Sequence, residues 1–91
     1  MYYNIRGVPV YWDPAKSGLL KCERGVSFEE LVQAEVVGMR QHTSRIGQKL
    51  LLFRYKNYIW VAPFVYQGED MFLKTLYPSR KYTKLDRKGE L

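Results

Sequence analysis

The densest group of side chains able to handle phosphate follows the last apolar run of the chain. Within eight positions it combines three cations and two aromatic residues: Tyr77, Arg80, Lys81, Tyr82 and Lys84. Arginine grips two phosphate oxygens with its planar fork and stays charged, which suits the negatively charged transition state of a reaction at phosphate. We therefore expect Arg80 to be the transition-state clamp, with Lys81 beside it in the catalytic group and Lys84 on a flanking phosphate.

Tyr77 and Tyr82 stand on either side of Arg80 in the sequence. A tyrosine ring can stack on a base, and its hydroxyl can donate to a phosphate. We expect both residues to bind substrate. The alternatives are ordinary ones: the two rings pack the tail against a sheet, and the cations form a solvated basic tail.

Two cations interrupt apolar strands, where a charge must face water or a functional surface. Arg54 follows the apolar run 50–53 and is the second candidate for the catalytic group. Lys74 shares a predicted strand face with Phe72 and Leu76, and is a candidate for binding substrate. The alternatives are a solvated strand end for Arg54 and, for Lys74, an ammonium that reaches water across apolar surface.

His42 is the single histidine and lies in a predicted loop, 41–45. Imidazole is the side chain best suited to take up and release a proton near neutral pH, so His42 is the candidate general base or acid. The alternative is an exposed loop residue without a role. One histidine and one cysteine leave no plausible zinc site, so we expect no metal and no cofactor. If the substrate is RNA, cleavage without a metal would proceed by attack of the ribose 2′-OH on the adjacent phosphate.

The length and composition are those of one small folded domain. The chain has 91 residues, of which 46% are apolar and 15% aromatic. That content supports a core but leaves little room for an internal cofactor cavity. We expect a single domain over 1–91, with its core at about 8–86. No segment approaches the roughly 20 apolar residues of a membrane span, and the lone Cys22 forbids an internal disulfide, which favours a cytoplasmic protein.

Positive charge is concentrated after the first third of the chain. The net charge is +6, and residues 36–68 hold five basic residues and no acidic one, whereas 1–35 carry a net charge of −1. This asymmetry suggests an oriented anionic partner. RNA is the first candidate and an acidic protein the second. An anionic membrane is a distant third that we do not expect, and a simple excess of lysine is the remaining alternative.

Two helix starts stand out in the first forty residues. Asp13-Pro14 combines an N-cap with the helical position that proline favours, and predicts a helix that ends at Gly25. Ser27 and Glu30 form a capping box, which predicts the start of a second helix. Apolar residues at helical spacing extend that second helix toward Gly38 as its stop.

Strand-like segments dominate the rest of the chain, with a hairpin turn expected at Lys56-Asn57. The expected strands are 8–12, 39–42, 49–55, 58–65 and 71–77. Pro63 cannot donate a ladder hydrogen bond, so its strand needs a bulge or a free side there. The tail after Pro78 should be a short helix or an arm. The predicted fold is α+β: two N-terminal helices packed on one face of a small antiparallel sheet.

This order of elements and two short motifs resemble the BrnT family of type II toxins, whose fold is like that of the RelE ribonucleases. The opening motif of the family is matched by Trp12-Asp13, Lys16 and residues 25–30, and its ending by Ser79-Arg80-Lys81 and Thr83. The family often has histidine before the glycine of the opening motif, where this chain has Arg24. The resemblance covers about residues 8–86.

The resemblance implies a RelE-like ribonuclease that cleaves mRNA, free or on the ribosome, and so blocks translation. It also implies a cognate antitoxin that covers the basic face, with DNA reached only through the toxin–antitoxin complex. Two alternatives stay open: a non-catalytic module that binds RNA, DNA or an acidic protein, and a relative whose only remaining partner is the antitoxin. In an enzyme, Arg80→Ala should abolish cleavage, whereas a binding module should weaken gradually as charges are removed.

Overall fold

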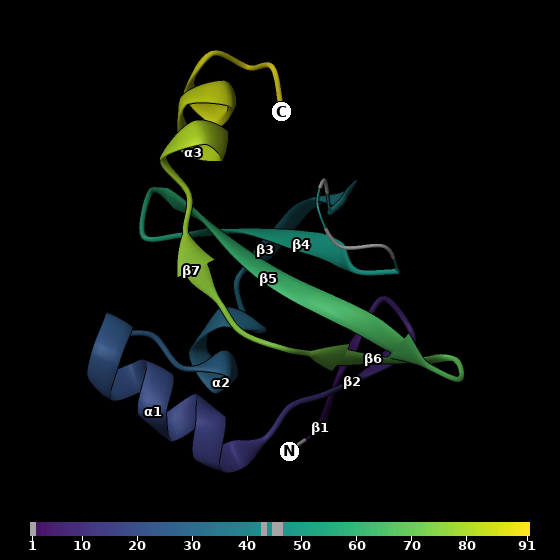
Figure 1. The fold of residues 1–91 in the computed structure, drawn as a ribbon. Helices are drawn as coiled ribbons and strands as arrows, with labels where there is room; N and C mark the ends of the chain where they lie inside the picture. Colours follow the sequence, from purple (N-terminus) through teal and green to yellow (C-terminus); the bar gives the residue numbers. More distant parts are fainter. Residues whose placement is uncertain (1, 43, 45–46) are drawn as a thin grey trace.

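A mixed β-sheet forms the body of the protein (Figure 1). The computed structural model describes residues 2–42, 44 and 47–91. Its strands are β1 (Tyr2–Ile5), β2 (Val8–Tyr11), β3 (Glu35–Gln41), β4 (Lys49–Tyr55), β5 (Tyr58–Gln67), β6 (Asp70–Leu73) and β7 (Tyr77–Pro78). Its helices are α1 (Pro14–Arg24), α2 (Phe28–Leu31) and α3 (Arg80–Arg87). The strand order is β1-β2-β6-β5-β4-β3, and β7 pairs with β5 beyond the end of β6.

This architecture shows that the predicted fold class, two N-terminal helices on a small antiparallel sheet, was wrong. Over the described residues the sheet has seven strands, and it is mixed because β2 and β6 run parallel. The first helix has the expected length and α3 forms in the tail, where a short helix or an arm was expected, but α2 is only four residues long. The sheet, rather than a pair of helices, is the main structural unit.

The start and the end of α1 follow from local chemistry, and this prediction is confirmed. The carboxylate of Asp13 accepts a 2.9 Å hydrogen bond from a backbone N–H of the first turn, and Pro14 lies in that turn. Gly25 ends the helix at φ 79°, a left-handed conformation that glycine adopts without steric cost. The capping box is confirmed as well, because the side chains of Ser27 and Glu30 each accept from the other's backbone N–H.

The second helix is much shorter than the apolar spacing suggested. It ends at Leu31, and by Glu35 the chain is already in β3, so Gly38 is not a helix stop. The β-branched neighbours Val36 and Val37 favour an extended chain, in which successive side chains face opposite sides of the sheet. Val36 accordingly packs against one core cluster and Val37 against the other, and a bulge follows between Val36 and Gly38. Val36 therefore reaches the core as a strand residue, and its helical spacing is a coincidence.

The first residues form a hairpin that the sequence analysis did not predict. Strands β1 and β2 pair so that Ile5 lies opposite Val8, around a two-residue turn at Arg6-Gly7. Both turn residues have positive φ, 52° and 83°, as a tight hairpin turn requires. Arg6 also donates a 3.4 Å hydrogen bond to the carbonyl of Val36 in β3. Since β1 and β3 are at opposite ends of the strand order, the sheet must be curled (Figure 1).

One side of the sheet, here called the inner face, is covered by α1 and α2. Its core joins Leu20 of α1 and Phe28 and Leu31 of α2 to strand residues such as Phe53 and Phe64. All five side chains are at most 1% exposed. Burial on this scale is the main favourable contribution to folding in a domain of this size.

A polar cluster fixes α1 against α2 beside this core. Glu29 accepts a 3.1 Å hydrogen bond from Trp12 Nε1 and another from the hydroxyl of Ser17. Ser17 in turn accepts from the backbone N–H of Phe28 at 2.9 Å. Burial opposes the ionisation of Glu29, but the hydrogen bonds outweigh it and lower the pKa of this carboxyl. The carboxylate therefore acts as a structural group.

The opposite side of the sheet, the outer face, is covered only in part, by α3. An apolar cluster lies beneath this helix, made of Leu50, Leu52, Ile59 and Val61. Two hydrogen bonds of 2.9 Å attach the helix to β5: Ile59 N–H donates to Thr83 Oγ1, and Ser79 N–H donates to the carbonyl of Ile59. Helix α3 lies well apart from α1 and α2 (Figure 1). In the part of the chain described here, no helix is long and apolar enough to cross a membrane.

Candidate functional site

A hollow opens on the outer face where the chain leaves the sheet between β6 and β7. Pro63 lies between the stretches of β5 that pair with these two strands. Its carbonyl accepts a 2.8 Å hydrogen bond from Lys74 N–H, but proline has no N–H to return. Because the N–H and C=O of one residue face the same neighbouring strand, the ladder stops here and residues 74–76 leave the sheet. Of the two outcomes predicted for Pro63, a bulge or a free side, the structure has the free side.

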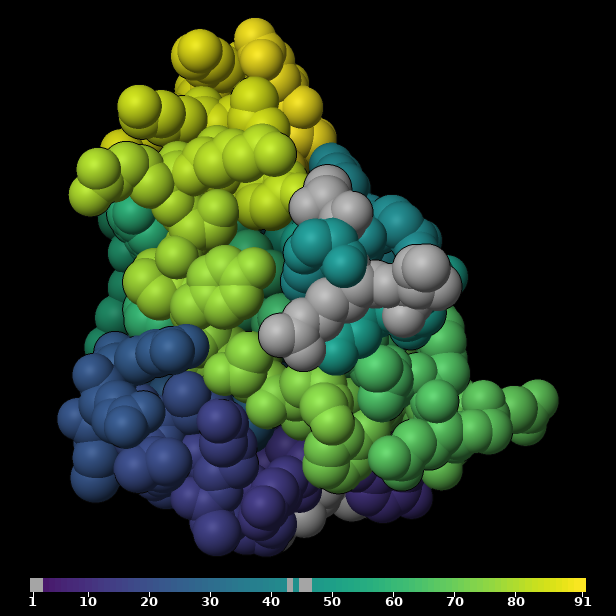
Figure 2. Space-filling model, viewed as in Figure 1, coloured from purple at the N-terminus to yellow at the C-terminus, as the bar shows by residue number. Residues whose placement is uncertain are grey.

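Three of the candidate residues meet at this hollow, which has a volume of about 240 Å³. Its lining residues are His42, Gln48, Pro63, Lys74, Thr75 and Tyr77. Figure 2 shows this face, with the yellow-green atoms of residues 74–78 beside teal atoms from the end of β3 and the start of β4. Residues that the sequence suggested one by one are therefore neighbours in the fold.

His42 follows the end of β3 and is held by its own loop. Its backbone N–H donates to the carbonyl of Gln48 at 3.1 Å, and its Nδ1 accepts from the backbone N–H of Ser44 at 3.2 Å. With Nδ1 as an acceptor, a neutral imidazole carries its proton on Nε2. That tautomer donates a hydrogen bond, for example to a phosphate oxygen. The sequence predicts His42 as a general base or acid, and this hydrogen bond at Nδ1 favours a donor over a base.

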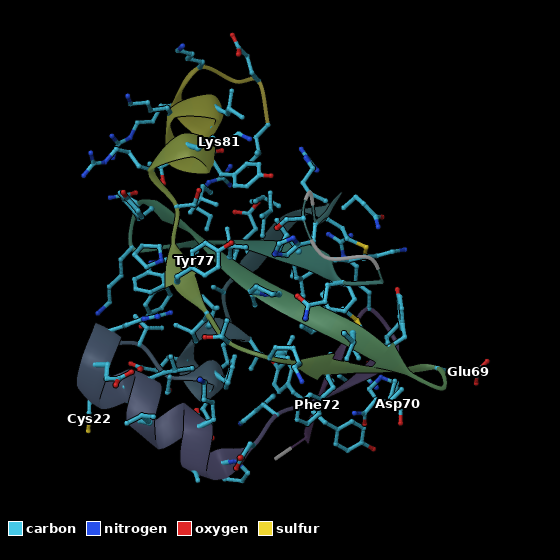
Figure 3. The ribbon with its side chains drawn as sticks, viewed as in Figure 1. Cys22, Glu69, Asp70, Phe72, Tyr77 and Lys81 are labelled. Atoms are coloured by element: carbon cyan, nitrogen blue, oxygen red, sulfur yellow. The ribbon has the colours of Figure 1, made fainter. Side chains whose placement is uncertain are left out.

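Tyr77 lines the hollow, and in Figure 3 it lies below α3. Burial raises the pKa of its hydroxyl above the ordinary value for tyrosine, and the neighbouring Tyr82 adds to the effect. The hydroxyl therefore keeps its proton throughout the neutral range and can donate it in a hydrogen bond. Both rings pack against the apolar cluster of the outer face, but only Tyr77 also lines the hollow.

Three of the four cations of α3 are candidate residues, and they lie outside the hollow. Arg80, Lys81 and Lys84 are exposed on a helix whose buried residue is Thr83. Arg80 and Lys84 are four positions apart, so they share one side of the helix. Lys81 places its ammonium 5.4 Å from the centre of the Tyr82 ring. These three cations, here called the basic strip, offer contacts to several phosphates, but none of them lines the hollow.

Arg54 holds α3 on the sheet. Its Nε donates to Asp86 Oδ2 at 3.1 Å, its Nη2 donates to the other oxygen of that carboxylate, and its Nη1 donates to Glu35 Oε1 at 2.7 Å. Asp86 and then Glu35 raise the pKa of Arg54, and Arg54 lowers the pKa of Asp86. While α3 is docked, both edges of this guanidinium are occupied by carboxylates. The structure therefore places Arg54 apart from the hollow and in contact with two acidic partners.

Sequence reasoning missed three residues that shape this site. Gln48 and Thr75 line the hollow, but they are ordinary polar residues beside strand ends and gave no distinctive signal. Arg24, at the end of α1, donates to the carbonyl of Leu76, immediately before Tyr77. The one signal for Arg24 was its position, where the resembled family often has histidine. That position contacts the segment that forms the wall of the hollow.

The chemistry of the hollow is that of an anion site. Its lining residues include Lys74, Tyr77 and His42, whose ammonium, hydroxyl and imidazole groups can donate to phosphate oxygens. Within residues 2–42, 44 and 47–91, no three His, Cys, Asp or Glu side chains are grouped so that they could hold a metal ion. The residues present can therefore bind a phosphate and stabilise negative charge on it.

A curled mixed sheet with a C-terminal helix on its outer face defines a fold of the BrnT type. The structure is similar to the crystal structure of the ribonuclease toxin BrnT from Brucella abortus, with a TM-score of 0.52. The similarity covers 77% of this chain and 94% of that chain at 14% sequence identity, so it shows the fold alone. The sequence matches no protein-family model, and no curated protein matches it. The expected BrnT-like fold is confirmed.

Proposed function

We propose that this protein is a ribonuclease toxin that cuts RNA at the hollow of the outer face. The observation that carries the proposal is the convergence of His42, Lys74 and Tyr77 at one hollow, on a fold shared with a ribonuclease toxin. At about 240 Å³ the hollow is smaller than the about 300–1,000 Å³ of a typical small-molecule site. It suits one sugar–phosphate unit of a longer chain that lies across the surface.

In this proposal the lining residues divide the work of cleavage. The ribose 2′-oxygen attacks the phosphorus, its proton passes to water, and the bond to the 5′-oxygen breaks to leave a 2′,3′-cyclic phosphate. Lys74 neutralises the charge that develops on the phosphate, and His42 Nε2–H donates to one of its oxygens. The Tyr77 hydroxyl, which its raised pKa keeps protonated, supplies the proton to the departing 5′-oxygen.

The cations outside the hollow take supporting roles. We assign Arg80, Lys81 and Lys84 to the phosphates that flank the cleaved one, because they are exposed on α3 beyond Tyr77. The role of Arg80 as transition-state clamp stays a prediction, and it requires the first turn of α3 to move toward the hollow. Arg54 positions α3 through Asp86 rather than touching RNA.

The wider setting follows from the fold similarity and the distribution of charge. We propose a RelE-like toxin that acts in the cytoplasm on mRNA, free or bound to the ribosome, and so blocks translation. A cognate antitoxin with an acidic surface would cover the basic outer face, and contact with DNA would be made only by the toxin–antitoxin complex. The support is the similarity to a ribonuclease toxin and the net charge of +6.

The test is incubation of the purified protein with RNA in EDTA, followed by mapping of the fragment ends. We expect fragments with 2′,3′-cyclic phosphate ends from the wild type and about 10²-fold slower cleavage by Lys74→Ala. Lys56→Ala is the matched control. It removes the same charge from a lysine that also lies over a ring, 5.4 Å from Tyr55 against 5.6 Å from Phe72 for Lys74. RNA left intact by the wild type, on and off the ribosome, would overturn the proposal.

One observation favours a second candidate, a module that binds RNA without cutting it. Because Ser44 donates to Nδ1 of His42, the hollow contains no histidine nitrogen that is ready to take the 2′-OH proton. Such a module would leave RNA intact, and Lys74→Ala and Lys56→Ala would weaken its binding to a similar, small extent.

A further inference from the structure

A row of apolar side chains lies next to the hollow on the outer face. Phe72 of β6 faces outward, because its neighbours Met71 and Leu73 are buried in the inner core. In the register of the sheet, Tyr11 of β2 lies on one side of Phe72 and Val65 of β5 on the other. Tyr11 is 38% exposed, and Phe72 and Val65 are half-buried. Tyr11, Phe72 and Val65 together are here called the platform.

Lys74 connects the platform to the hollow. Its ammonium lies 5.6 Å from the centre of the Phe72 ring, and the same side chain lines the hollow. On β5, Pro63 of the hollow and Val65 of the platform are two positions apart and so face the same side. The two sites are therefore adjacent along both strands, and Figure 3 shows Phe72 and Tyr77 along this part of the sheet.

We infer that the platform stacks an unpaired base of single-stranded RNA, next to the nucleotide whose phosphate lies in the hollow. This inference rests on the proposed function for the identity of the ligand in the hollow. Every base has an aromatic face, and stacking on a protein ring is a sequence-tolerant way to hold it. Lys74 sits between the two sites, where it can contact the phosphate that joins the two nucleotides. A base within a duplex is not free to stack in this way, so the substrate class is single-stranded.

The charges at the two ends of β6 favour one side of the platform for the phosphates of the bound strand. Lys74 follows the end of the strand nearer the hollow, whereas Glu69 and Asp70 lie at the other end, beyond Phe72 (Figure 3). A phosphate would be attracted at the lysine end and repelled at the carboxylate end. The platform therefore holds the last stacked base of the bound segment, and Asp70→Asn should tighten binding about twofold by removing one repulsive charge.

The inner side of the sheet supplies a matched control. Tyr66 is 48% exposed, and the ammonium of Lys49 lies 5.6 Å from its ring centre, as for Lys74 over Phe72. Tyr66 lies opposite Met71 in the register and so faces the inner side. The two pairs share their chemistry and differ in which face they occupy.

The experiment measures the anisotropy of fluorescein-labelled 2′-O-methyl hexaadenylate, which cannot be cleaved because the attacking hydroxyl is blocked. Phe72→Ala should raise the Kd about 5- to 100-fold, and Phe72→Leu, which keeps the apolar volume without an aromatic face, should also raise it. Tyr66→Ala should leave the Kd within about twofold. An abasic position in the oligonucleotide should weaken binding to the wild type and add nothing to the effect of Phe72→Ala. A duplex of equal length should bind more weakly.

Two results would overturn the inference: an unchanged Kd for Phe72→Leu, or equal loss from Tyr66→Ala. Each is distinguishable from failure of the proposed function. If the wild type cuts RNA but Phe72→Leu binds the oligonucleotide normally, the platform is wrong and the ribonuclease stands. If Phe72 controls binding but no RNA is cut, the inference about the platform is correct and the proposed ribonuclease activity is wrong. The protein would then bind RNA without cleaving it.

Discussion

The inner and outer faces of the sheet differ in how they are covered. On the inner face, α1 and α2 bury large apolar side chains, and the few polar groups there, such as Glu29 and Ser17, bond to one another. On the outer face, α3 covers a smaller apolar cluster and leaves the hollow and the platform open. In the proposed function, stability and RNA handling therefore belong to different side chains, and each should change without the other.

The most destructive test of this contrast is Phe28→Ala on the inner face. Phe28 is 0% exposed and its ring centre lies 6.0 Å from that of Trp12. Removing the ring leaves a cavity, so the free energy of unfolding should fall by about 3–5 kcal/mol, measured by urea unfolding. RNA cleavage should be lost only in proportion to the unfolded fraction. A fall of less than about 1 kcal/mol in the free energy of unfolding would contradict the view that the inner face supplies the stability.

Tyr77→Phe tests the outer face, where the substitution should change RNA cleavage and leave stability unchanged. The substitution keeps the packed ring and removes only the hydroxyl, so the free energy of unfolding should stay within about 0.5 kcal/mol. Single-turnover cleavage should slow about 10²-fold, because the substitution removes the proposed donor to the 5′-oxygen. Tyr66→Phe, at the exposed tyrosine of the inner side, should leave the rate unchanged.

The pH dependence of the same reaction gives an independent check. Burial raises the pKa of Tyr77 above the ordinary tyrosine pKa of 10.0. The hydroxyl therefore keeps its proton as the pH rises toward 10.0 and loses it only at higher pH. The advantage of wild type over Tyr77→Phe should therefore persist through the neutral range and vanish at the alkaline end. An advantage that disappears below pH 8 would rule out this phenol as the donor.

Local signals in the sequence predicted the parts of the fold that local chemistry determines. The Asp13 cap, the capping box at Ser27 and the turn at Lys56-Asn57, where both residues have positive φ, are all present. The signals failed where distant segments decide the outcome. Pairing of β2 with β6 joins residues about sixty positions apart, and Val36 takes its place in β3 because β4 offers it a partner.

The same distinction between local and distant determinants applies to the candidate site. His42, Lys74 and Tyr77 were identified from side-chain chemistry alone, and the structure places all three at one hollow. Their grouping was not predictable, because it depends on Pro63 ending the ladder from a different strand. Arg54 was singled out as a charge in an apolar strand, and its principal partner, Asp86, lies 32 positions away. A pattern within one strand carries no information about such a partner.

Thr83→Val is a smaller perturbation, confined to the attachment of α3. Thr83 is 3% exposed, and its hydroxyl accepts from Ile59 N–H while donating to the carbonyl of Ser79 at 2.6 Å. Valine leaves a buried donor without a partner, so the free energy of unfolding should fall by about 1–3 kcal/mol. Hydrogen exchange at Ile59 should quicken while exchange at Phe28 does not.

Thr83→Ser is the control for that substitution, because it keeps the hydroxyl and should restore slow exchange at Ile59. If instead α3 and the inner face loosen together in Thr83→Val, the two faces are not independent, and the contrast between them fails.

The smallest expected effect concerns acid, and it compares one carboxylate from each face. A hydrogen bond from Lys21, followed by the capping contact at Ser27, lowers the pKa of Glu30 from 4.5 to about 2. A carboxyl whose pKa is lower in the folded state adds stability above its unfolded pKa, and this is lost as the pH falls from 4.5 toward 2. Asp86, whose pKa Arg54 lowers, acts in the same direction on the outer face.

Glu30→Gln should therefore flatten the fall of the unfolding free energy between pH 4.5 and pH 2. Because the Lys21 and Glu30 side chains are 53% and 34% exposed, the effect should be small and should shrink further in high salt. Asp86→Asn should likewise flatten the fall of the unfolding free energy at acid pH. It should also quicken hydrogen exchange at Ile59, because it releases α3 from Arg54. If Glu30→Gln also quickened exchange at Ile59, the acid response of the inner face would reach α3, and the two faces would have to be treated as one cooperative unit.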